Sequence, residues 1–245
     1  MNRVLVVGAA GKMGKAVQAA AVGRDDVRIA GTVDQGDDVA AAIAACDVYI
    51  DFSTPAATVA AARAAIAAKR AAIIGTTGLG ADAEPIFAEL AKVAPVVVAA
   101  NFSLGVNLML GLVRQAARAL GPTWDAEVVE THHKAKRDAP SGTALAIARA
   151  IAAGHGADYD AVKRHTRDGD VGPRPLGEIG VATVRGGDVV GEHVAYFFGE
   201  HERIEIAHRA TSRSIFATGA LVAAAWAVGK PPGRYTMLDV LGLPS

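Results

Sequence analysis

Short apolar runs alternate with alanine-rich segments along the first hundred residues, and this alternation constrains the fold more than any other feature. The runs are rich in Val and Ile, as expected of strands buried on both faces. They lie at Val4–Val7, Val27–Val33, Val48–Ile50, Ala71–Ile74 and Val96–Ala100. Between them, helical segments are expected at Met13–Val22, Ala56–Ala68 and Pro85–Val93, with a shorter one between Asp34 and Cys46. Such alternation requires crossover connections, and it predicts a doubly wound parallel sheet.

The pattern changes after Asn101. An amphipathic helix is expected over Leu104–Leu120, where Gly121-Pro122 stops it. We then expect a strand at Ala126–Thr131, a helix at Thr143–Ala153 and a loop over residues 155–176. Three strand candidates separated by glycine-containing turns indicate antiparallel hairpins; they are Ile179–Val184, His193–Phe198 and Arg203–His208. The sequence therefore predicts a second α+β domain on a mixed or antiparallel sheet.

The C-terminal segments are expected to return to the first domain. A helix is predicted at Ser214–Val228 and a short one at Met237–Leu241, with a break at Pro231-Pro232-Gly233 between them. The predicted domains are therefore residues 1–102 plus about 215–245 for dinucleotide binding, and about 103–214 for substrate binding and oligomerisation. Two crossings, near 101–103 and 212–218, suggest closure over a substrate. A small sheet with one helix cannot cover both of its faces, so we expect copies to pair through it.

Composition limits the classes of partner. The 25 basic residues balance 25 acidic ones, so the surface has no general attraction for nucleic acid or anionic lipid. Cys46 is the single cysteine and is expected to be an inert thiol, which fits a reducing compartment. No segment has the shape of a signal peptide, and none approaches the roughly 20 apolar residues of a membrane helix. We therefore expect a cytoplasmic protein.

A glycine-rich turn follows the first strand and opens the first helix. It reads Gly8-Ala9-Ala10-Gly11-Lys12-Met13-Gly14, with the spacing G-x-x-G-x-x-G instead of the common G-x-G-x-x-G. Glycines let a backbone turn tightly against a pyrophosphate, and the helix N-terminus offers free N–H groups. Asp34 ends the second strand 20 residues after Gly14, where an acid that binds the adenosine ribose is expected. These features predict a Rossmann domain that binds NADH, NADPH or both.

Two features of this region bear on cofactor choice and on the rest of the site. The charge of Asp34 disfavours a 2′-phosphate and Gln35 does not compensate it, although Lys12 could, so we expect NADH to be used at least as well as NADPH. Later strands end in ligand-suited residues, and ligands of open α/β sheets lie beyond the strand carboxyl ends. These tails are Asp51-Phe52-Ser53, Gly75-Thr76-Thr77-Gly78 and Ala99-Ala100-Asn101-Phe102.

The densest chemistry lies between the strand that ends at Thr131 and the helix that starts near Thr143. His132-His133 and three basic residues, Lys134, Lys136 and Arg137, make a basic patch in a neutral protein. Ser141-Gly142-Thr143 then opens the helix, whose N–H and hydroxyl donors suit a carboxylate. The segment is typical of a site for a small dicarboxylate with a proton donor beside it, although a solvated loop with a helix cap remains an alternative. A metal site is not expected, since adjacent histidines on an extended segment point to opposite sides.

The run from Glu130 to Ala144, E-x-H-H-x-x-K-x-D-A-P-S-G-T-A, resembles the signature of the 4-hydroxy-tetrahydrodipicolinate reductase (dihydrodipicolinate reductase) family. The resemblance covers essentially the whole chain. It includes the glycine-rich turn, the strand tails, Ile179-Gly180 with Ala182-Thr183-Val184-Arg185, and Gly191-Glu192-His193.

The resemblance implies an NAD(P)H-dependent oxidoreductase of lysine and diaminopimelate biosynthesis, usually a homotetramer joined through its second-domain sheets. It implies that His132 and Lys136 are catalytic and that His133, Gly142 and Thr143 hold a substrate carboxylate. The implied cofactor contacts are Gly8, Ala9, Ala10, Gly11, Lys12, Met13, Asp34, Gly75, Thr76, Thr77, Ala99, Ala100, Asn101 and Phe102. Family members often carry a basic residue where Gln35 stands, which counts against strong NADPH use.

Two other readings remain. One is a different two-domain NAD-dependent dehydrogenase that acts on an amino or keto acid. The other is a nicotinamide-sensing regulator without turnover, although such a protein has no use for His132-His133 beside an anion site.

Overall fold

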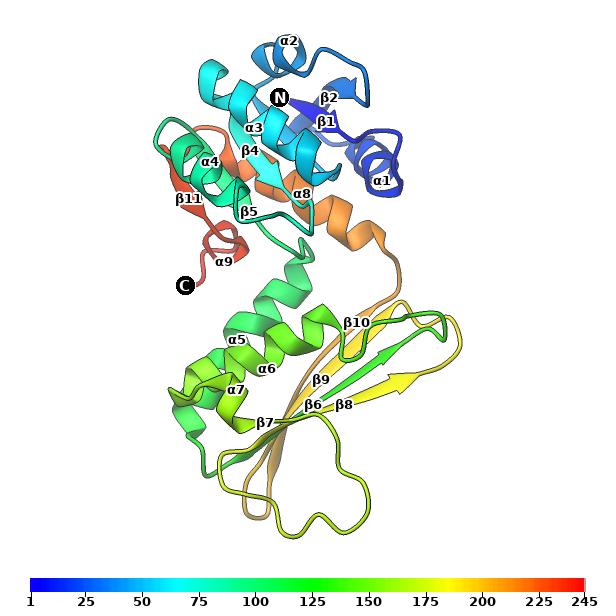
Figure 1. Ribbon diagram of the computed structural model, residues 1–245, viewed down its shortest axis with the longest axis vertical. Coiled ribbons are helices and arrows are strands. Elements are labelled where there is room, and N and C mark those ends of the chain that lie inside the picture. Colours follow the sequence, from blue (N-terminus) through cyan, green and yellow to red (C-terminus); the bar gives the residue numbers. More distant parts are fainter. Residues whose placement is uncertain (245) are drawn as a thin grey trace. The chain divides into compact units, whose positions relative to one another are not determined.

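The computed structural model describes residues 1–244 and divides the chain into two compact units (Figure 1). The first unit contains Met1–Leu104 together with the segment that starts at Ser214, and the second contains Gly105–Arg213. Across residues 1–244, none of the helices is both long enough and apolar enough to cross a membrane.

The first unit is built on a parallel sheet with the strand order β11-β5-β4-β3-β1-β2. Its strands are β1 (Asn2–Val7), β2 (Val27–Val33), β3 (Val48–Asp51), β4 (Ala71–Ile74), β5 (Pro95–Val98) and β11 (Gly233–Tyr235). All neighbouring strands run parallel, which confirms the doubly wound sheet predicted from the sequence. The order of successive strands reverses between β1 and β3, and open α/β sheets bind ligands at such a point. β11 was not predicted, because its three residues follow Pro231-Pro232 and carry no apolar pattern.

Helices cover both faces of this sheet. They are α1 (Lys12–Ala21), α2 (Val39–Ala44), α3 (Pro55–Ala68), α4 (Ala83–Leu90), α8 (Ser214–Ala227) and α9 (Met237–Val240). The strand side chains alternate between two cores: Val4 and Val6 pack with residues of α1 and α8, whereas Leu5 and Val7 pack with residues of α2, α3 and α4. Burial on both faces explains why these strands read as continuous apolar runs.

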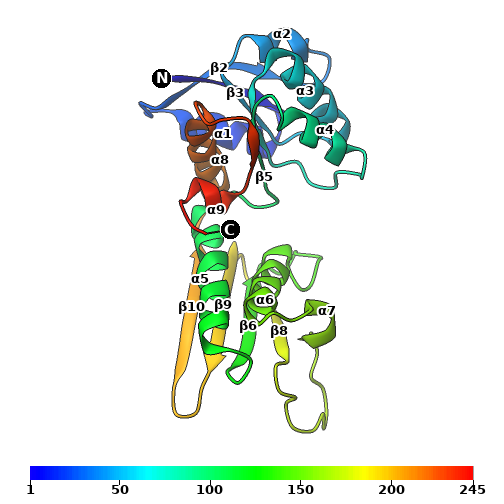
Figure 2. The ribbon, with the colours of Figure 1, turned by 90° about the vertical axis from the view of Figure 1, so that its left-hand side faces the viewer.

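The second unit is built on a mixed sheet with the order β10-β9-β6-β8-β7. Its elements are α5 (Leu104–Leu120), β6 (Asp125–His132), α6 (Gly142–His155), α7 (Tyr159–Val162), β7 (Lys163–Arg164), β8 (Ile179–Arg185), β9 (Gly191–Phe198) and β10 (Arg203–Ala210). β9 pairs antiparallel with both β6 and β10, while β8 runs parallel to β6. Figure 2 shows α5 and α6 lying along one face of this sheet.

Two predictions for this unit are wrong. β8 and β9 do not form a hairpin, because β6 lies between them, and only β9 and β10 pair as expected. Residues 155–176 are not loop throughout, since α7 and β7 lie within them. Both elements are too short to show a periodic pattern, and the N-cap of α7 is the Asp158 carboxylate.

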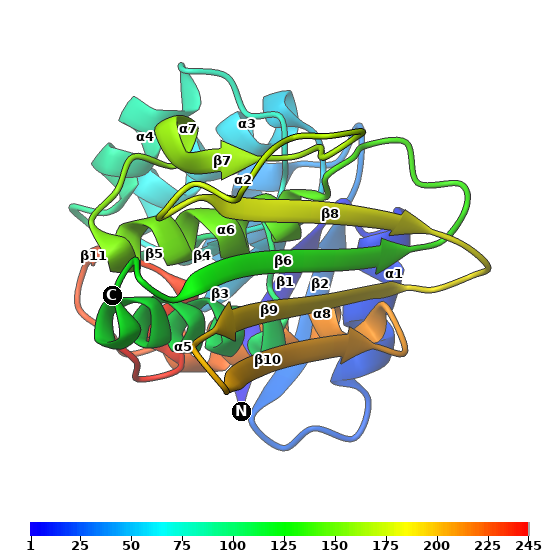
Figure 3. The same cartoon turned by 90° about the horizontal axis from the view of Figure 1, so that it is seen from below.

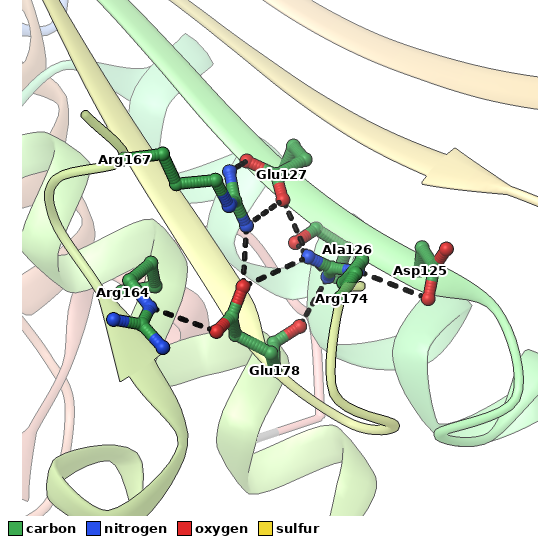
Figure 4. A network of polar contacts seen from close by, with 7 residues as sticks. All are labelled: Asp125, Ala126, Glu127, Arg164, Arg167, Arg174 and Glu178. Carbon is green, nitrogen blue, oxygen red and sulfur yellow. Dashed lines mark hydrogen bonds and ion pairs between the residues drawn. The ribbon is translucent and has the colours of Figure 1, made fainter. Parts of the chain in front are cut away.

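The connection from β7 to β8 is held by ion pairs (Figure 4). Arg167 and Arg174 both contact Glu127 of β6, at 2.7 and 2.6 Å. Both also reach Glu178, which Arg164 contacts on its other oxygen. Glu178 is buried, and the surrounding guanidinium groups offset the cost of desolvating its carboxylate. Burial raises its pKa, but the groups of Arg164 and Arg167 lower it below the ordinary value overall.

The other face of the mixed sheet lies opposite α5 and α6 (Figure 3). The alternating pattern of β6 and β9 puts Val129, Val194 and Tyr196 on this face, where they are half-buried. Val184 and Phe198 lie there too, and are 47% and 38% exposed. We call these five residues the open-face patch. An exposed apolar patch on a sheet face is typical of a surface that is covered by another chain.

Candidate functional site

The glycine-rich turn between β1 and α1 is packed so closely that two of its glycines have no room for a side chain. Gly8 has φ +78°, and a Cβ there would lie 2.9 Å from the carbonyl oxygen of Phe52. A Cβ on Gly14 would lie 2.2 Å from the carbonyl oxygen of Gly8, so the first turn of α1 packs directly on the loop. Gly11 is the N-cap of α1, and no side chain caps that end of the helix. The first turn of α1 therefore presents N–H groups that no side chain caps, as the helix after a phosphate-binding turn does.

Asp34 lies at the end of β2 beside this turn. Its two carboxylate oxygens accept the backbone N–H of Ala10, at 3.1 and 3.0 Å, and its own N–H donates to Asp37 at 2.8 Å. A cavity of about 650 Å³ lies next to them. It is lined by Val7, Gly8, Gly11, Val33, Asp34, Gln35, Gly36, Asp37, Val39, Phe52, Ser53, Thr54, Ala56, Ala57 and Ala60. This lining contains two carboxylates and neither Lys nor Arg.

The tails of β3, β4 and β5 meet at one edge of the first sheet. The buried Asp51 carboxylate accepts the Ser53 N–H and the Thr76 hydroxyl, and Thr76 accepts a second bond from Ser53 N–H at 3.0 Å. Burial raises the pKa of Asp51, and the bonds from Ser53 and its neighbours only partly offset that effect. The Phe52 ring packs against Gly75, where a Cβ would lie 2.1 Å from that ring. It also packs edge to face with Phe102, with 5.7 Å between the ring centroids.

Some of the predicted cofactor contacts are restricted by burial. The side chains of Ala9 and Phe102 are 4% and 1% exposed, so a ligand could reach only their backbone. Lys12, Ala10, Thr77 and Ala100 are exposed, whereas Met13, Gly75, Ala99 and Asn101 are half-buried.

Glu130 is the centre of a buried polar cluster at the carboxyl end of β6. Its Oε1 accepts the Ser141 N–H at 3.0 Å, the Thr183 hydroxyl at 3.2 Å and the Arg185 Nη2 at 2.9 Å. Its Oε2 accepts the Arg185 Nη1 at 2.9 Å and contacts Nδ1 of His132. Burial raises the pKa of Glu130, but the bonds from Arg185, His132 and Ser141 outweigh burial and lower it overall. The carboxylate is therefore ionised at neutral pH.

His132 closes β6 on the buried side of the sheet and is 8% exposed. Burial lowers its pKa, and the positive charges of Lys136 and Arg185 lower it further against the opposing effect of Glu130. His193 on β9 meets it edge to face at 5.2 Å. Burial, together with the charge of His132, lowers the pKa of His193 to about 4, so this second ring is neutral.

His133 and Lys136 occupy the turn that follows. His133 is half-buried, and its Nε2 lies 3.3 Å from Nη2 of Arg213. The Lys136 ammonium pairs with Asp138 at 2.9 Å, which lowers the pKa of that carboxyl group. Lys136 and Arg213 therefore bring positive charges to this turn, which follows the buried imidazole of His132.

The N-terminus of α6 lies next to this cluster. Ser141 is the N-cap, and its hydroxyl accepts the Ala144 N–H at 3.1 Å and lies 3.2 Å from Nε2 of His193. Gly142 is exposed and Thr143 is half-buried, so the first turn can be reached from solvent. The structure therefore places His132, His133, Lys136, Gly142 and Thr143 in the same part of the second unit.

Several residues of the cofactor cavity and of the Glu130 cluster had no role in the sequence prediction. Glu130, Arg185 and His193 were quoted only as parts of motifs, and Arg213 and Asp37 were not singled out. An ionisable residue on the buried face of an alternating strand, such as Glu130 on β6, is a signal that sequence reasoning could have used.

Comparisons with known proteins identify the family of this chain. Residues 2–102 match the family described as "Dihydrodipicolinate reductase, N-terminus", and residues 105–241 match "Dihydrodipicolinate reductase, C-terminus". The chain belongs to the dihydrodipicolinate reductase family. These matches confirm the family resemblance that was inferred from the segment Glu130–Ala144.

Curated relatives of this dihydrodipicolinate reductase family member span its full length. The 4-hydroxy-tetrahydrodipicolinate reductase of Anaeromyxobacter dehalogenans strain 2CP-1 is 50% identical, with 99% of this chain and 98% of the relative covered. The enzyme of that name from Geobacter metallireducens is 44% identical over 99% of this chain and all of the relative. Among solved structures, a dipicolinate-bound dihydrodipicolinate reductase from Paenisporosarcina sp. TG-14 has the same fold, with a TM-score of 0.81, 23% identity and 98% of each chain covered.

Proposed function

We propose that this chain is an oxidoreductase of lysine and diaminopimelate biosynthesis that reduces 4-hydroxy-tetrahydrodipicolinate to tetrahydrodipicolinate with NAD(P)H and loss of water. One observation carries the proposal: a buried imidazole, an ammonium group and an open helix N-terminus lie together in a chain that also has a dinucleotide-binding turn. Full-length identity of 50% to a relative with this named activity supports it.

We assign cofactor binding to the first unit. The turn from Gly8 to Gly14 fits a pyrophosphate because a Cβ at either end would collide with the neighbouring backbone. Asp34 would bind the adenosine ribose, and the tails of β3, β4 and β5 would hold the nicotinamide ring, which supplies the hydride when bound. Within those tails we assign contacts to Gly75, Thr76, Thr77 and residues 99–102.

We further propose that NADH is used at least as well as NADPH. The cavity beside Asp34 is lined by the carboxylates of Asp34 and Asp37 and by no cation, so a 2′-phosphate would meet two like charges. The specificity constants for NADH and NADPH, measured with the same substrate, test this assignment. A tenfold higher constant for NADPH would contradict it.

We assign substrate binding to the second unit. His133, Gly142 and Thr143 would hold a substrate carboxylate, with the N–H donors of the first turn of α6 directed at it. The charge of Lys136 would offset that of the dianion and polarise the imine region. The exposed Gly142 leaves the helix N-terminus open to such a ligand.

His132 would donate the proton. Hydride addition leaves an enamine-like centre that must gain a proton, and an imidazolium can supply it. In the free protein burial lowers the pKa of His132, so the ring is largely neutral near pH 7. A bound dianion favours the imidazolium form, so substrate binding itself would protonate the donor.

Substitution of the two proposed catalytic residues tests the assignment. Turnover of the substrate, made by enzymatic condensation of pyruvate with aspartate semialdehyde, is followed as loss of NADH. We expect His132→Ala and Lys136→Ala to lower kcat by about 10²–10⁴-fold, the loss typical of a removed proton donor. Lys134→Ala is the matched control, because Lys134 is exposed in the same turn and has no assigned role. Near-normal turnover in either of the first two variants would refute the roles.

We also propose that the protein is a cytoplasmic homotetramer joined through the open-face patch. Tyr196 and Phe198 stack there at 5.6 Å between ring centroids, and Val184 adds a large exposed apolar side chain. Burying such a surface against a second copy would stabilise both chains. Light scattering that returned only monomer at working concentration would reject the assembly.

A further inference from the structure

The Glu130 carboxylate joins three segments of the second unit that are remote in sequence. Its oxygens accept hydrogen bonds from Arg185 and Thr183 on β8. They also contact the Ser141 N–H at the start of α6 and His132 on the same strand. It is fully buried, and both oxygens are occupied by donors. A buried carboxylate with that many donors is held in one orientation, and it holds its partners in turn.

The contact with His132 fixes the proton of the neutral ring. An ionised carboxylate can only accept, so Nδ1 of His132 must carry the hydrogen that points to Oε2 of Glu130. The other nitrogen, Nε2, is then the one that exchanges a proton with a ligand. Carboxylates that orient a functional histidine in this way also stabilise its charged form.

Gly191 leaves room beside that second nitrogen. Gly191 faces His132 from the neighbouring strand β9, and a Cβ at this position would lie 2.9 Å from Nε2 and 3.3 Å from Cδ2. The backbone of Gly191 is not in the left-handed region, so the absence of a side chain meets no conformational need there. What the glycine provides is space at the reactive edge of the ring.

We propose that Glu130 is the positioning residue of the reaction: it sets the tautomer and orientation of His132 and anchors the first turn of α6 at the same time. The inference rests on the proposed function for the role of His132, but the geometry of Glu130 does not depend on it. Glu130 acts through its bonds to His132 and Ser141.

The groups that determine the charge of His132 come from every neighbouring element. Glu130 on β6 favours the imidazolium form, whereas Lys136 in the next turn and Arg185 on β8 oppose it. His193 on β9 is neutral, with its own neighbour His208 on β10. Because Glu130 is the one anion in this set, replacing it with a neutral residue removes the charge that favours the imidazolium form of His132.

Glu130→Gln tests the proposal without changing the shape of the side chain. Oε1 of Glu130 has three donors and Oε2 has two, so the amide nitrogen of the variant would take the Oε2 position. There it would donate to Nδ1 of His132 and move the ring proton to Nε2. We expect ¹⁵N NMR of the protein without substrate to show protonated Nδ1 in the wild type and protonated Nε2 in the variant. We expect His132 to titrate at lower pH in the variant, and kcat to fall at least about tenfold.

Glu127→Gln is the matched control, since Glu127 lies on the same strand but on the opposite face, within the ion pairs of Figure 4. It should leave the tautomer and titration of His132 unchanged. Gly191→Ala is a second probe, expected to lower kcat at least about tenfold while Nδ1 stays protonated, because the added methyl group occupies the space beside Nε2.

The outcomes separate this proposal from the proposed function. Protonated Nε2 in neutral wild-type His132, or a titration of His132 that does not move in Glu130→Gln, would overturn the role of Glu130. The wild-type spectrum decides this even if the variant does not fold. If the NMR results hold and wild-type protein does not reduce the substrate, the role of Glu130 in holding His132 stands and the proposed activity fails.

Discussion

His193 should make the second unit sensitive to acid. The ring is 4% exposed and its Nε2 lies 3.2 Å from the Ser141 hydroxyl, and burial keeps the ring neutral in the folded chain. Burial lowers its pKa from 6.5 to about 4, whereas in the unfolded chain it titrates near 6.5. Between these values the unfolded state binds the proton and the folded state does not. The titration of His193 therefore costs no unfolding free energy above about pH 6.5, and the unfolding free energy falls as the pH drops to about 4.

The size of this effect follows from the two pKa values. The difference between 6.5 and about 4, at about 1.4 kcal/mol for each pH unit, corresponds to about 3 kcal/mol of unfolding free energy. His193→Gln removes the titration but keeps an amide group that can form a hydrogen bond with the Ser141 hydroxyl. We expect the wild type to lose about 3 kcal/mol more than this variant between pH 6.5 and pH 4.

Urea unfolding at a series of pH values measures the difference. Trp124 lies in the second unit and Trp226 in the first, so fluorescence in a Trp226→Phe background reports on the second unit. His201→Gln is the control, because the His201 side chain is 93% exposed and cannot contribute through burial. Parallel loss of stability in the wild type and His193→Gln would refute the reasoning, since it would show that His193 is not held neutral.

Three further outcomes are expected. Gly14→Ala should weaken NADH binding at least about tenfold in a fluorescence titration, because its Cβ would lie 2.2 Å from the Gly8 carbonyl oxygen; unchanged affinity would contradict the assigned turn. Val184→Lys should shift the assembly to smaller species in light scattering, since it puts a charge into the open-face patch, and an intact tetramer would exclude that face. Cys46 should react with a thiol reagent only after unfolding, since burial raises its pKa to about 11; rapid reaction of the folded protein would count against its burial.

The sequence predicted best those elements whose burial is uniform or whose ends are marked. β4 has the predicted bounds, Ala71–Ile74, because each of its residues is buried between two helical layers. The bounds of α5 are also as predicted, since Gly121 has a positive φ and stops the helix. β11 was missed because it is stabilised by pairing with β5 and not by an apolar pattern of its own.

Strand order in the second unit could not be predicted from neighbouring segments. The turn at Gly186-Gly187 suggested that β8 and β9 pair, but β6 inserts between them and takes β8 as a parallel partner. An apolar pattern states which face a residue takes and not which strand lies beside it. That is why the sequence alone does not connect Glu130 with Arg185, which is 55 residues away.

The candidate site was predictable where it is contiguous. His132, His133, Lys136, Gly142 and Thr143 come from one segment, and the structure places them in one part of the second unit. The partners that orient them, Arg185 and His193, come from β8 and β9 and depend on the sheet register. Their roles therefore become apparent only when the fold is known.

Reduction of the substrate with NADH that carries deuterium at C4 of its nicotinamide ring tests the central claim most directly. Mass spectrometry of the dicarboxylate formed by the wild-type protein should show a product one mass unit heavier with one of the two C4 epimers, and an unlabelled product with the other. An unlabelled product with both epimers, or a substrate that is not consumed, would contradict the proposed reductase activity.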